Sequence, residues 1–124
     1  MISSLFLNLK LLRLNTFPEN QIICREIITA GKFIEKLLGL TFKNLKEYQG
    51  FLIINCNGIH TFWMRYKIDV LFLDKEDYVI ELYESLSPFS MTPTIKKACK
   101  VVELTNLTIK KNKIRIGDKL LFLI

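Results

Sequence analysis

Three residues in one short stretch of the sequence could together perform chemistry: Cys56, His60 and Asp69. A thiol, an imidazole and a carboxylate are the nucleophile, the base and the orienting group of a site that transfers acyl groups through a thiolate. If the segment ending at Met64 pairs directly with the segment starting at Lys67, the alternation of side chains places His60 and Asp69 on opposite faces. A pairing shifted by one residue would bring them together. A hydrolase using Cys56 and His60 is therefore kept as an alternative and is not the favoured function.

Asp69 also belongs to a second candidate group, with Trp63 and Arg65. A carboxylate inside the apolar run 68–73 must be either solvated or paired, because an unpaired buried charge is costly. Arg65, Lys67 and the ring N–H of Trp63 are its candidate partners, and the favoured interpretation is that Asp69 ties the corner of a hairpin. In the functional interpretation, Trp63, Arg65 and Asp69 line a shallow polar and aromatic site that holds a ligand or a peptide.

Metal and cofactor sites have little support in the sequence. Cys56 and His60 could supply two zinc ligands, but a tetrahedral zinc site needs four ligands, or three and a water molecule. Neither Cys24 nor Cys99 has a partner at ligand spacing. No glycine-rich loop precedes a predicted helix, so nucleotide binding is not indicated either. We expect no metal and no cofactor.

The net charge of +6 is concentrated in the last quarter of the chain, since residues 94–124 carry eight basic and two acidic side chains. Such an asymmetry can indicate an anionic partner. The stretch has one aromatic residue for base stacking, Phe122, and no nucleic-acid motif. We expect at most weak, non-specific binding to nucleic acid through the basic side chains, which are Lys96, Lys97, Lys100, Lys110, Lys111, Lys113, Arg115 and Lys119.

Length and composition predict a single domain over residues 1–124, because 124 residues of which 50% are hydrophobic suffice for one core. No apolar run reaches the roughly 18 residues that cross a bilayer, and no signal peptide is recognisable. The three cysteines are odd in number and form no Cys-x-x-Cys pair. These features predict reduced, buried and inert thiols in a cytoplasmic protein.

The pattern of apolar residues predicts short strands separated by turns. Alternation and β-branched residues indicate strands over 5–16, 21–28, within 51–74, and over 78–86, 99–104 and 119–123. The run 51–74 is broken at Asn57-Gly58 and is expected to form strands that lie side by side. Asp74–Asp77 has the composition of a hairpin turn, residues 87–94 that of a loop, and Asn106 is expected to take a left-handed conformation. One helix is predicted over about 30–39, with its N-cap at Thr29 and its end at Gly39.

Several short motifs follow one another along the chain. They are Ala30-x-x-Phe33-x-x-Lys36-x-x-Gly39-Leu40, the run Cys56–Arg65, Ile68-Asp69-Val70-x-Phe72-Leu73-Asp74, Leu86-x-Pro88, Val102-Glu103-Leu104 and Gly117-Asp118. In type and order they resemble the motifs of a bacterial and archaeal family, the domain of unknown function 192. Two residues depart from the family pattern: Lys36 stands where an arginine is usual and Asn106 where a glycine is usual. The resemblance implies a compact, mainly β fold with no established activity.

Together these observations predict a small, mainly β protein, a sandwich or barrel of six to eight short strands with one short α-helix at about 30–39. The sequence favours a non-enzymatic binding or accessory domain whose partner is an unknown small ligand or protein. The Cys56/His60 hydrolase and weak nucleic-acid binding are the two alternatives.

Overall fold

The computed structural model describes residues 9–14, 21–30, 45–62 and 64–123. Within these ranges the chain forms seven strands and one short helix. In chain order they are β1 (Leu9–Leu14), β2 (Gln21–Ala30), β3 (Gln49–Ile54), β4 (Ile68–Leu73), β5 (Val79–Leu86), β6 (Lys100–Thr105), α2 (Thr108–Asn112) and β7 (Lys119–Leu123). No helix in the described part of the chain is long and apolar enough to cross a membrane. The prediction of a mainly β fold is confirmed.

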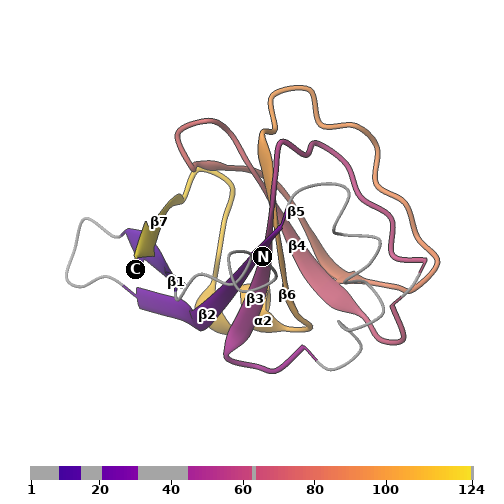
Figure 1. Ribbon diagram of the computed structural model, residues 1–124, viewed down its shortest axis with the longest axis horizontal. Helices are drawn as coiled ribbons and strands as arrows, with labels where there is room; N and C mark the ends of the chain where they lie inside the picture. The colour runs from indigo at the N-terminus through magenta and orange to yellow at the C-terminus, as the bar shows by residue number, and fades with distance from the viewer. Residues whose placement is uncertain (1–8, 15–20, 31–44, 63, 124) are drawn as a thin grey trace.

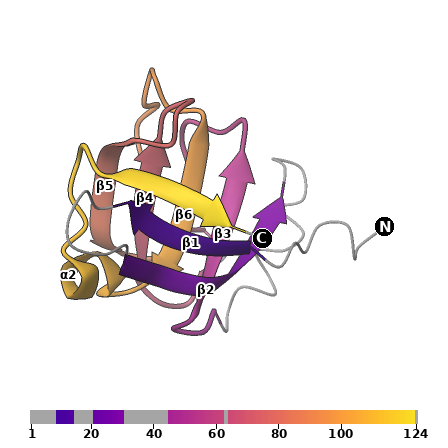
Figure 2. The ribbon, with the colours of Figure 1, turned by 90° about the vertical axis from the view of Figure 1, so that its left-hand side faces the viewer.

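The strands form one seven-stranded sheet in the order β5-β4-β6-β3-β2-β1-β7. All neighbours are antiparallel except β2 and β3, which are parallel. The sheet bends so that β7, β1 and the first part of β2 cross the other strands at a steep angle (Figures 1 and 2). The two edge strands meet through the bridge between Tyr78 and Lys119, but no continuous ladder joins β5 to β7. The fold is a sheet bent towards a barrel and not closed.

The ten-residue strand β2 forms the corner of this sheet. Its first part, Gln21 to Ile27, pairs with β1, and its last part, Glu26 to Ala30, pairs with β3. A long strand shared by two layers is a common way to make such a corner. At the change of partner, the backbone N–H groups of Arg25 and Glu26 both donate to the carbonyl of Tyr48. The N–H groups of Arg25 and Glu26 therefore both keep an acceptor at the corner.

The sheet carries an apolar core on each of its two faces. The inner core includes Ile27, Leu71, Val102 and Leu104, and the outer core includes Phe51, Ile53, Ile68, Phe72 and Val101. Consecutive residues of β4 alternate between the two cores, and every residue of β4 is buried. This explains why β4 reads as a continuous apolar run, as strands covered on both faces do.

The predicted strands agree with the structure in their ranges but not in all their neighbours. The hairpins β1–β2 and β4–β5 are confirmed, as are the loop that begins at residue 87 and the last strand at Lys119–Leu123. The direct pairing proposed between the segments ending at Met64 and starting at Lys67 is wrong, because β4 pairs with β5 and β6 instead. Likewise β3 and β4 do not lie side by side, since β6 lies between them. The expected strand that ends at Met64 is also wrong, since the described residues between β3 and β4 contribute only the bridge of His60 with Met91. The errors in pairing leave the other strand ranges unchanged, because each concerns a partner distant in sequence.

The predicted helix over about 30–39 lies, except for Ala30, outside the described residues. Thr29 and Ala30 are the last residues of β2, so the N-cap expected at Thr29 is wrong. The described helix, α2, was not predicted. It follows Leu107, which takes the left-handed conformation with φ 73°, whereas Asn106 does not. The left-handed position predicted for Asn106 is therefore displaced by one residue.

Gly50 is required by the packing between β2, β3 and β6. A methyl group at this position would lie 2.9 Å from Cδ1 of Ile27, 3.0 Å from Sγ of Cys24 and 3.1 Å from Cδ2 of Leu104. We expect Gly50→Ala to lower the free energy of unfolding by about 1–3 kcal/mol, because an added methyl group overpacks the inner core. Urea denaturation followed by fluorescence measures this change.

Gly58→Ala is the matched control for this substitution. A methyl group at Gly58 would approach no neighbour closer than 3.5 Å, an ordinary contact. Its unfolding free energy should stay within about 0.5 kcal/mol of the natural protein, as for surface substitutions in general. Equal stability losses in the two variants would contradict the packing role assigned to Gly50.

Candidate functional site

Asp69 is fully buried in β4 and joins three separate elements. Its Oδ1 accepts a hydrogen bond of 2.9 Å from the backbone N–H of Ser85 in β5, and its Oδ2 accepts one of 2.8 Å from the backbone N–H of Ile109 in α2. Ser85 lies at an irregularity between β4 and β5 and has a positive φ of 53°. The carboxylate therefore holds both a strand irregularity and the first turn of a helix.

Asp69 replaces the cap that α2 lacks at its own N-terminus. Leu107 occupies the N-cap position and its side chain forms no capping hydrogen bond. The first N–H groups of a helix have no partner within the helix, so a buried helix start needs an acceptor from elsewhere. The hydroxyl of Ser85 also donates to Oδ1 of Asn106 over 2.5 Å, which ties β5 to the turn before α2. These contacts give Asp69 a structural role, as the sequence favoured, although its partners are backbone N–H groups.

The structure does not gather Trp63, Arg65 and Asp69 into a described site. Trp63 lies outside the described residues, Arg65 is exposed, and both carboxylate oxygens of Asp69 accept backbone hydrogen bonds. A ligand group at Asp69 would have to displace one of these bonds. The three-residue binding site stays a prediction.

Cys56 and His60 lie in the segment that follows β3, each with its own contacts. The Cys56 thiol is buried and donates to the carbonyl oxygen of Gly58 over 3.1 Å. The His60 ring stacks on Phe62 with 4.5 Å between ring centroids, and its Nδ1 is buried without a hydrogen-bond partner in the described structure. The described contacts join neither the thiol to the imidazole nor the imidazole to a carboxylate, so they supply no argument for a Cys56/His60 dyad, which stays a prediction.

The segments 57–62 and 89–95 pair with each other outside the main sheet, and we call them the two-loop ribbon. The backbone N–H of Thr61 donates to the carbonyl of Ser90, and that of Thr92 to the carbonyl of Ile59, each over 2.9 Å. His60 and Met91 form an antiparallel bridge. In Figure 1 the two segments run together along one flank of the molecule, in magenta and orange. Ile59 and Ile95 belong to the outer core or pack against it, so the ribbon is fixed to the sheet.

Two buried threonines fix the side of the ribbon that faces the protein. Oγ1 of Thr61 donates to the Ser87 carbonyl over 2.7 Å and accepts from the Ser90 N–H over 2.9 Å, while Oγ1 of Thr92 accepts from the Ile59 N–H over 3.0 Å. Thr61 is 1% exposed and Thr92 is 7% exposed. The bridge between His60 and Met91 places these two neighbours of the threonines opposite each other.

We call the side chains of His60, Phe62, Phe89 and Met91 the outer face of the ribbon. His60 stacks on Phe62 and pairs with Met91, and Phe89 lies in the turn before Met91, where its N–H donates to the Thr61 carbonyl. Phe62 is 41%, Phe89 78% and Met91 69% exposed. Residues 87–94 were predicted only as a loop, so Phe89 and Met91 were missed as surface partners. The signal that could have found them is two large apolar residues at alternate positions in a segment rich in serine, threonine and proline.

A second carboxylate, Glu103, was also missed as a residue of interest. It lies in β6, is 5% exposed, and pairs across the strands with Phe51 and Val70 of the outer core. Burial raises the pKa of Tyr66, and the charge of Glu103 adds to this, while the hydrogen bond that the Tyr66 hydroxyl accepts from the Leu45 N–H opposes it. The signal in the sequence was again a carboxylate inside an apolar run, as at Asp69.

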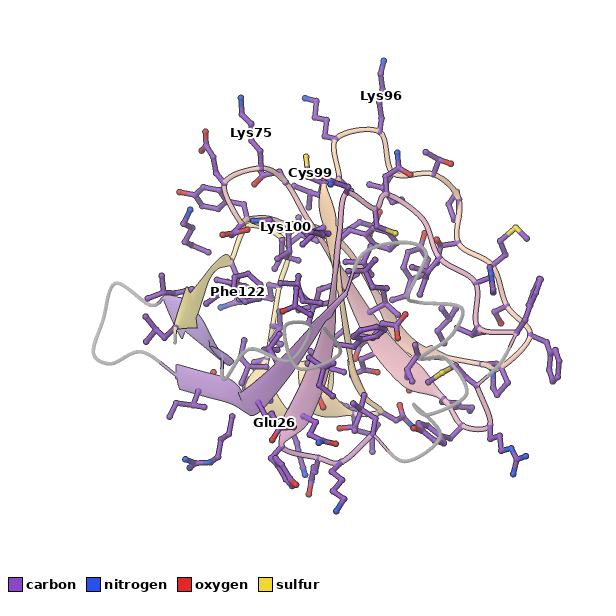
Figure 3. All side chains as sticks on the ribbon, in the orientation of Figure 1. Glu26, Lys75, Lys96, Cys99, Lys100 and Phe122 are labelled. Carbon is purple, nitrogen blue, oxygen red and sulfur yellow. The ribbon has the colours of Figure 1, made fainter. Side chains whose placement is uncertain are left out.

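The basic residues of the last quarter do not form one surface. Lys96 projects from the end of the molecule opposite α2, which carries Lys110 and Lys111 (Figures 1 and 3). Several of these cations have partners: Lys100 pairs with Asp77 over 2.5 Å, Lys111 pairs with Glu47, and Lys119 donates to the Glu76 carbonyl and lies 4.7 Å from the ring centre of Tyr78. Lys111 holds the pKa of Glu47 below its usual value, by its hydrogen bond and its charge. This distribution gives nucleic acid no continuous cationic track.

The thiols differ from the prediction at one position. Cys24 and Cys56 are buried, but Cys99 is exposed, so the expectation of three buried thiols is wrong for Cys99. Cys99 lies at the end of the molecule that carries Lys75 and Lys96 (Figure 3). Its backbone N–H donates to the carbonyl of Leu73, the last residue of β4, and its carbonyl accepts from the N–H of Cys56, which follows β3. These two bonds hold the backbone of Cys99 in place. Among residues 9–14, 21–30, 45–62 and 64–123, no three His, Cys, Asp or Glu residues could hold a metal ion together.

Asp69→Asn should lower the free energy of unfolding by about 1–3 kcal/mol, measured by urea denaturation, because one of the two buried N–H groups loses its acceptor and meets an amide N–H₂. Glu84→Gln makes the same chemical change on an exposed side chain of β5 and should leave the stability unchanged. An Asp69→Asn protein as stable as the Glu84→Gln protein would show that the carboxylate does not hold these elements together.

Thiol labelling of the folded protein should show one fast-reacting cysteine and two slow ones. Cys99 is exposed, whereas the buried thiols become accessible only when the protein opens or unfolds. Cys99→Ser should therefore remove the fast phase, and Cys56→Ser should not. A fast phase that persists in Cys99→Ser and disappears in Cys56→Ser would instead support an activated thiolate at Cys56.

Two solved structures have a fold similar to that of this chain. A candidate transcription regulator from Sinorhizobium meliloti 1021 has a similar fold, with a TM-score of 0.78 and 15% sequence identity over 94% of this chain and 95% of that one. A protein of unknown function from Novosphingobium aromaticivorans DSM 12444 has a TM-score of 0.74 and 17% identity over 90% of this chain and 83% of that one. At such identities the similarity concerns the fold alone.

No curated protein matches the sequence. The family model of DUF192, described as "Uncharacterized ACR", matches residues 16–122 and confirms the resemblance found in the motifs. The matched range includes the two-loop ribbon, Asp69, Glu103 and α2. The chain therefore belongs to the DUF192 family of uncharacterized proteins.

Proposed function

We propose that this chain is a non-enzymatic binding domain that holds a protein partner on the outer face of the two-loop ribbon. The observation that carries the proposal is the exposure of Phe62, Phe89 and Met91, at 41%, 78% and 69%, within one short pair of hydrogen-bonded loops. Aromatic and methionine side chains are enriched in protein–protein interfaces, and the aromatic side chains supply much of the binding energy.

The size of this face fits a binding site for a short element. An aromatic side chain presents about 150–250 Å², so the exposed fractions of the three side chains amount to roughly 400 Å² of apolar surface. A contiguous patch of about 300–600 Å² is the largest on a typical monomer and is often functional. A standard protein–protein interface buries about 800 Å² on each partner. The outer face is therefore large enough to bind the apolar residues of a peptide segment, but small for an interface with a whole domain.

The backbone beneath the outer face is held before any partner arrives. Thr61 and Thr92 bind the backbone of the opposite segment through their hydroxyl groups, and the Phe89 N–H donates to the Thr61 carbonyl over 3.1 Å. Binding to a preorganised surface costs less conformational entropy than binding that orders a loop. This supports recognition by a fixed surface over recognition by folding on contact.

The alternatives derived from the sequence stay predictions without a supporting contact. This applies to three of them: the hydrolase using Cys56 and His60, the binding site of Trp63, Arg65 and Asp69, and the cytoplasmic location. Weak nucleic-acid binding is disfavoured by the separation of the basic residues between two ends of the molecule.

A selection of phage-displayed random 12-residue peptides on the full chain tests the proposal. The affinity of the selected peptides is then measured by fluorescence anisotropy for the natural protein and for Phe89→Ser. We expect Phe89→Ser to weaken binding about tenfold or more, because burial of a phenylalanine contributes about 1.5–3 kcal/mol. Its folded stability should change little, since most of this side chain is in solvent.

Ile116→Ser is the matched control, because Ile116 is 59% exposed in the loop between α2 and β7, outside the ribbon. It should leave the affinity of the peptides unchanged. Peptides that bind Phe89→Ser as tightly as the natural protein would refute the outer face as the binding surface.

A further inference from the structure

We infer that the segment bound by the two-loop ribbon is acidic, with one or two apolar residues between its acidic side chains. This inference rests on the proposed function and adds the chemistry of the partner. It comes from the charges that the sequence places in the same loops, just beyond the ribbon segments 57–62 and 89–95.

The loops that form the ribbon carry cations and no anions. Residues 55–67 and 87–99 contain four basic residues, Arg65, Lys67, Lys96 and Lys97, and no Asp or Glu. All four are exposed. The carboxylate that follows these loops most closely, Asp69, is buried and engaged by backbone N–H groups. Beyond the loops, Glu84 on β5 is the exposed acidic residue closest in sequence.

These cations lie beyond both ends of the outer face. At one end, the Met64 N–H donates to the Thr61 carbonyl over 3.1 Å, and the exposed Arg65 follows directly. At the other end, the Ile95 N–H donates to the Asn57 carbonyl over 2.8 Å, and Lys96 and Lys97 follow. Five positions separate Met91 from Lys96, so an extended segment would span them with about five residues, at roughly 3.3 Å each. Electrostatic complementarity then adds to the specificity and to the association rate of binding.

A second copy of this chain does not fit the same face. In a twofold dimer the outer face would meet itself, which brings Arg65 and the two lysines towards like charges. The patch of roughly 400 Å² is also small beside the area that a stable dimer buries.

An anionic lipid surface fits less well than a peptide segment. Insertion into a membrane requires the cations to surround the apolar side chains at one depth. Here Lys96 projects from the end of the molecule, and the loop that carries it runs from there along the flank (Figures 1 and 3). An extended chain can follow this line, whereas a flat lipid surface cannot contact all of it together.

The test uses the selected 12-residue peptides and the double variant Lys96→Glu/Lys97→Glu. We expect the peptides to carry more Asp and Glu than Lys and Arg, to contain an apolar residue, and to bind more weakly as salt rises. The double variant should weaken binding about tenfold, as expected when attraction between close charges becomes repulsion. The control Lys46→Glu/Lys110→Glu changes the net charge equally on exposed residues outside the ribbon and should stay within about twofold.

The outcomes separate this inference from the proposed function. If Phe89→Ser abolishes binding and Lys96→Glu/Lys97→Glu does not, the outer face binds peptides and the acidic partner is refuted. If neither variant weakens binding, both fail. Two other anionic ligands are tested in the same way: vesicles of phosphatidylcholine with phosphatidylserine, and a 12-residue oligothymidylate. Binding of either that exceeds binding of the peptides and is lost in Phe89→Ser would overturn the peptide as occupant.

Discussion

The fold depends on one buried carboxylate. Asp69 lies in a strand covered on both faces, where an unpaired charge would cost several kcal/mol, on the order of the whole stability of a small domain. Two backbone N–H groups, one from β5 and one from α2, offset that cost over 2.9 and 2.8 Å. The same bonds satisfy donors that would otherwise be buried without an acceptor. Strand, irregularity and helix therefore stabilise one another, and removal of the carboxylate affects all three.

The second constraint is that the sheet buries apolar side chains on both of its faces. The inner core fills the bend between the two crossing layers, and the outer core needs a separate cover. The ribbon provides part of that cover, with Ile59 in the outer core and Ile95 packed against it. Thr61 and Thr92 bury their hydroxyl groups with hydrogen-bond partners, as buried polar groups must, while the nearby Phe62, Phe89 and Met91 are exposed. The same loops therefore carry a covered polar side and exposed apolar side chains.

The sequence predicted those features that local patterns encode. The ranges of β1, β2, β5, β6 and β7 agree to within a few residues, because turn residues and alternation are local signals. The neighbours of β3 and β4 were not predictable in this way, since β6, which follows both strands and the β5 hairpin in the chain, inserts between them. Helix α2 was missed for the same reason. It has five residues and no cap of its own, and the acceptor for its Ile109 N–H comes from Asp69, 40 residues earlier.

In the candidate site, too, the sequence indicated what a local pattern encodes and not what depends on contacts between distant residues. Asp69 stood out in the sequence because a carboxylate in an apolar run needs a partner, and its structural role was the favoured one. That its partners are backbone groups of β5 and α2, and not Arg65 or Lys67, depends on contacts that the sequence pattern does not contain. Phe89 and Met91 became candidates only in the structure, where Met91 pairs with His60 and the Phe89 N–H donates to the Thr61 carbonyl.

The exposed side chains of the ribbon are the part of the structure that folding explains least. Phe89 at 78% and Met91 at 69% exposure gain little from burial, so a polar residue at either position would cost the fold little. Scattered apolar residues need no explanation on a protein surface, but these share one face of a fixed backbone. Their backbone is held by hydroxyl groups whose loss would cost far more than the exposed side chains contribute. A rigid support beneath side chains that do not stabilise it is the arrangement that a binding surface requires.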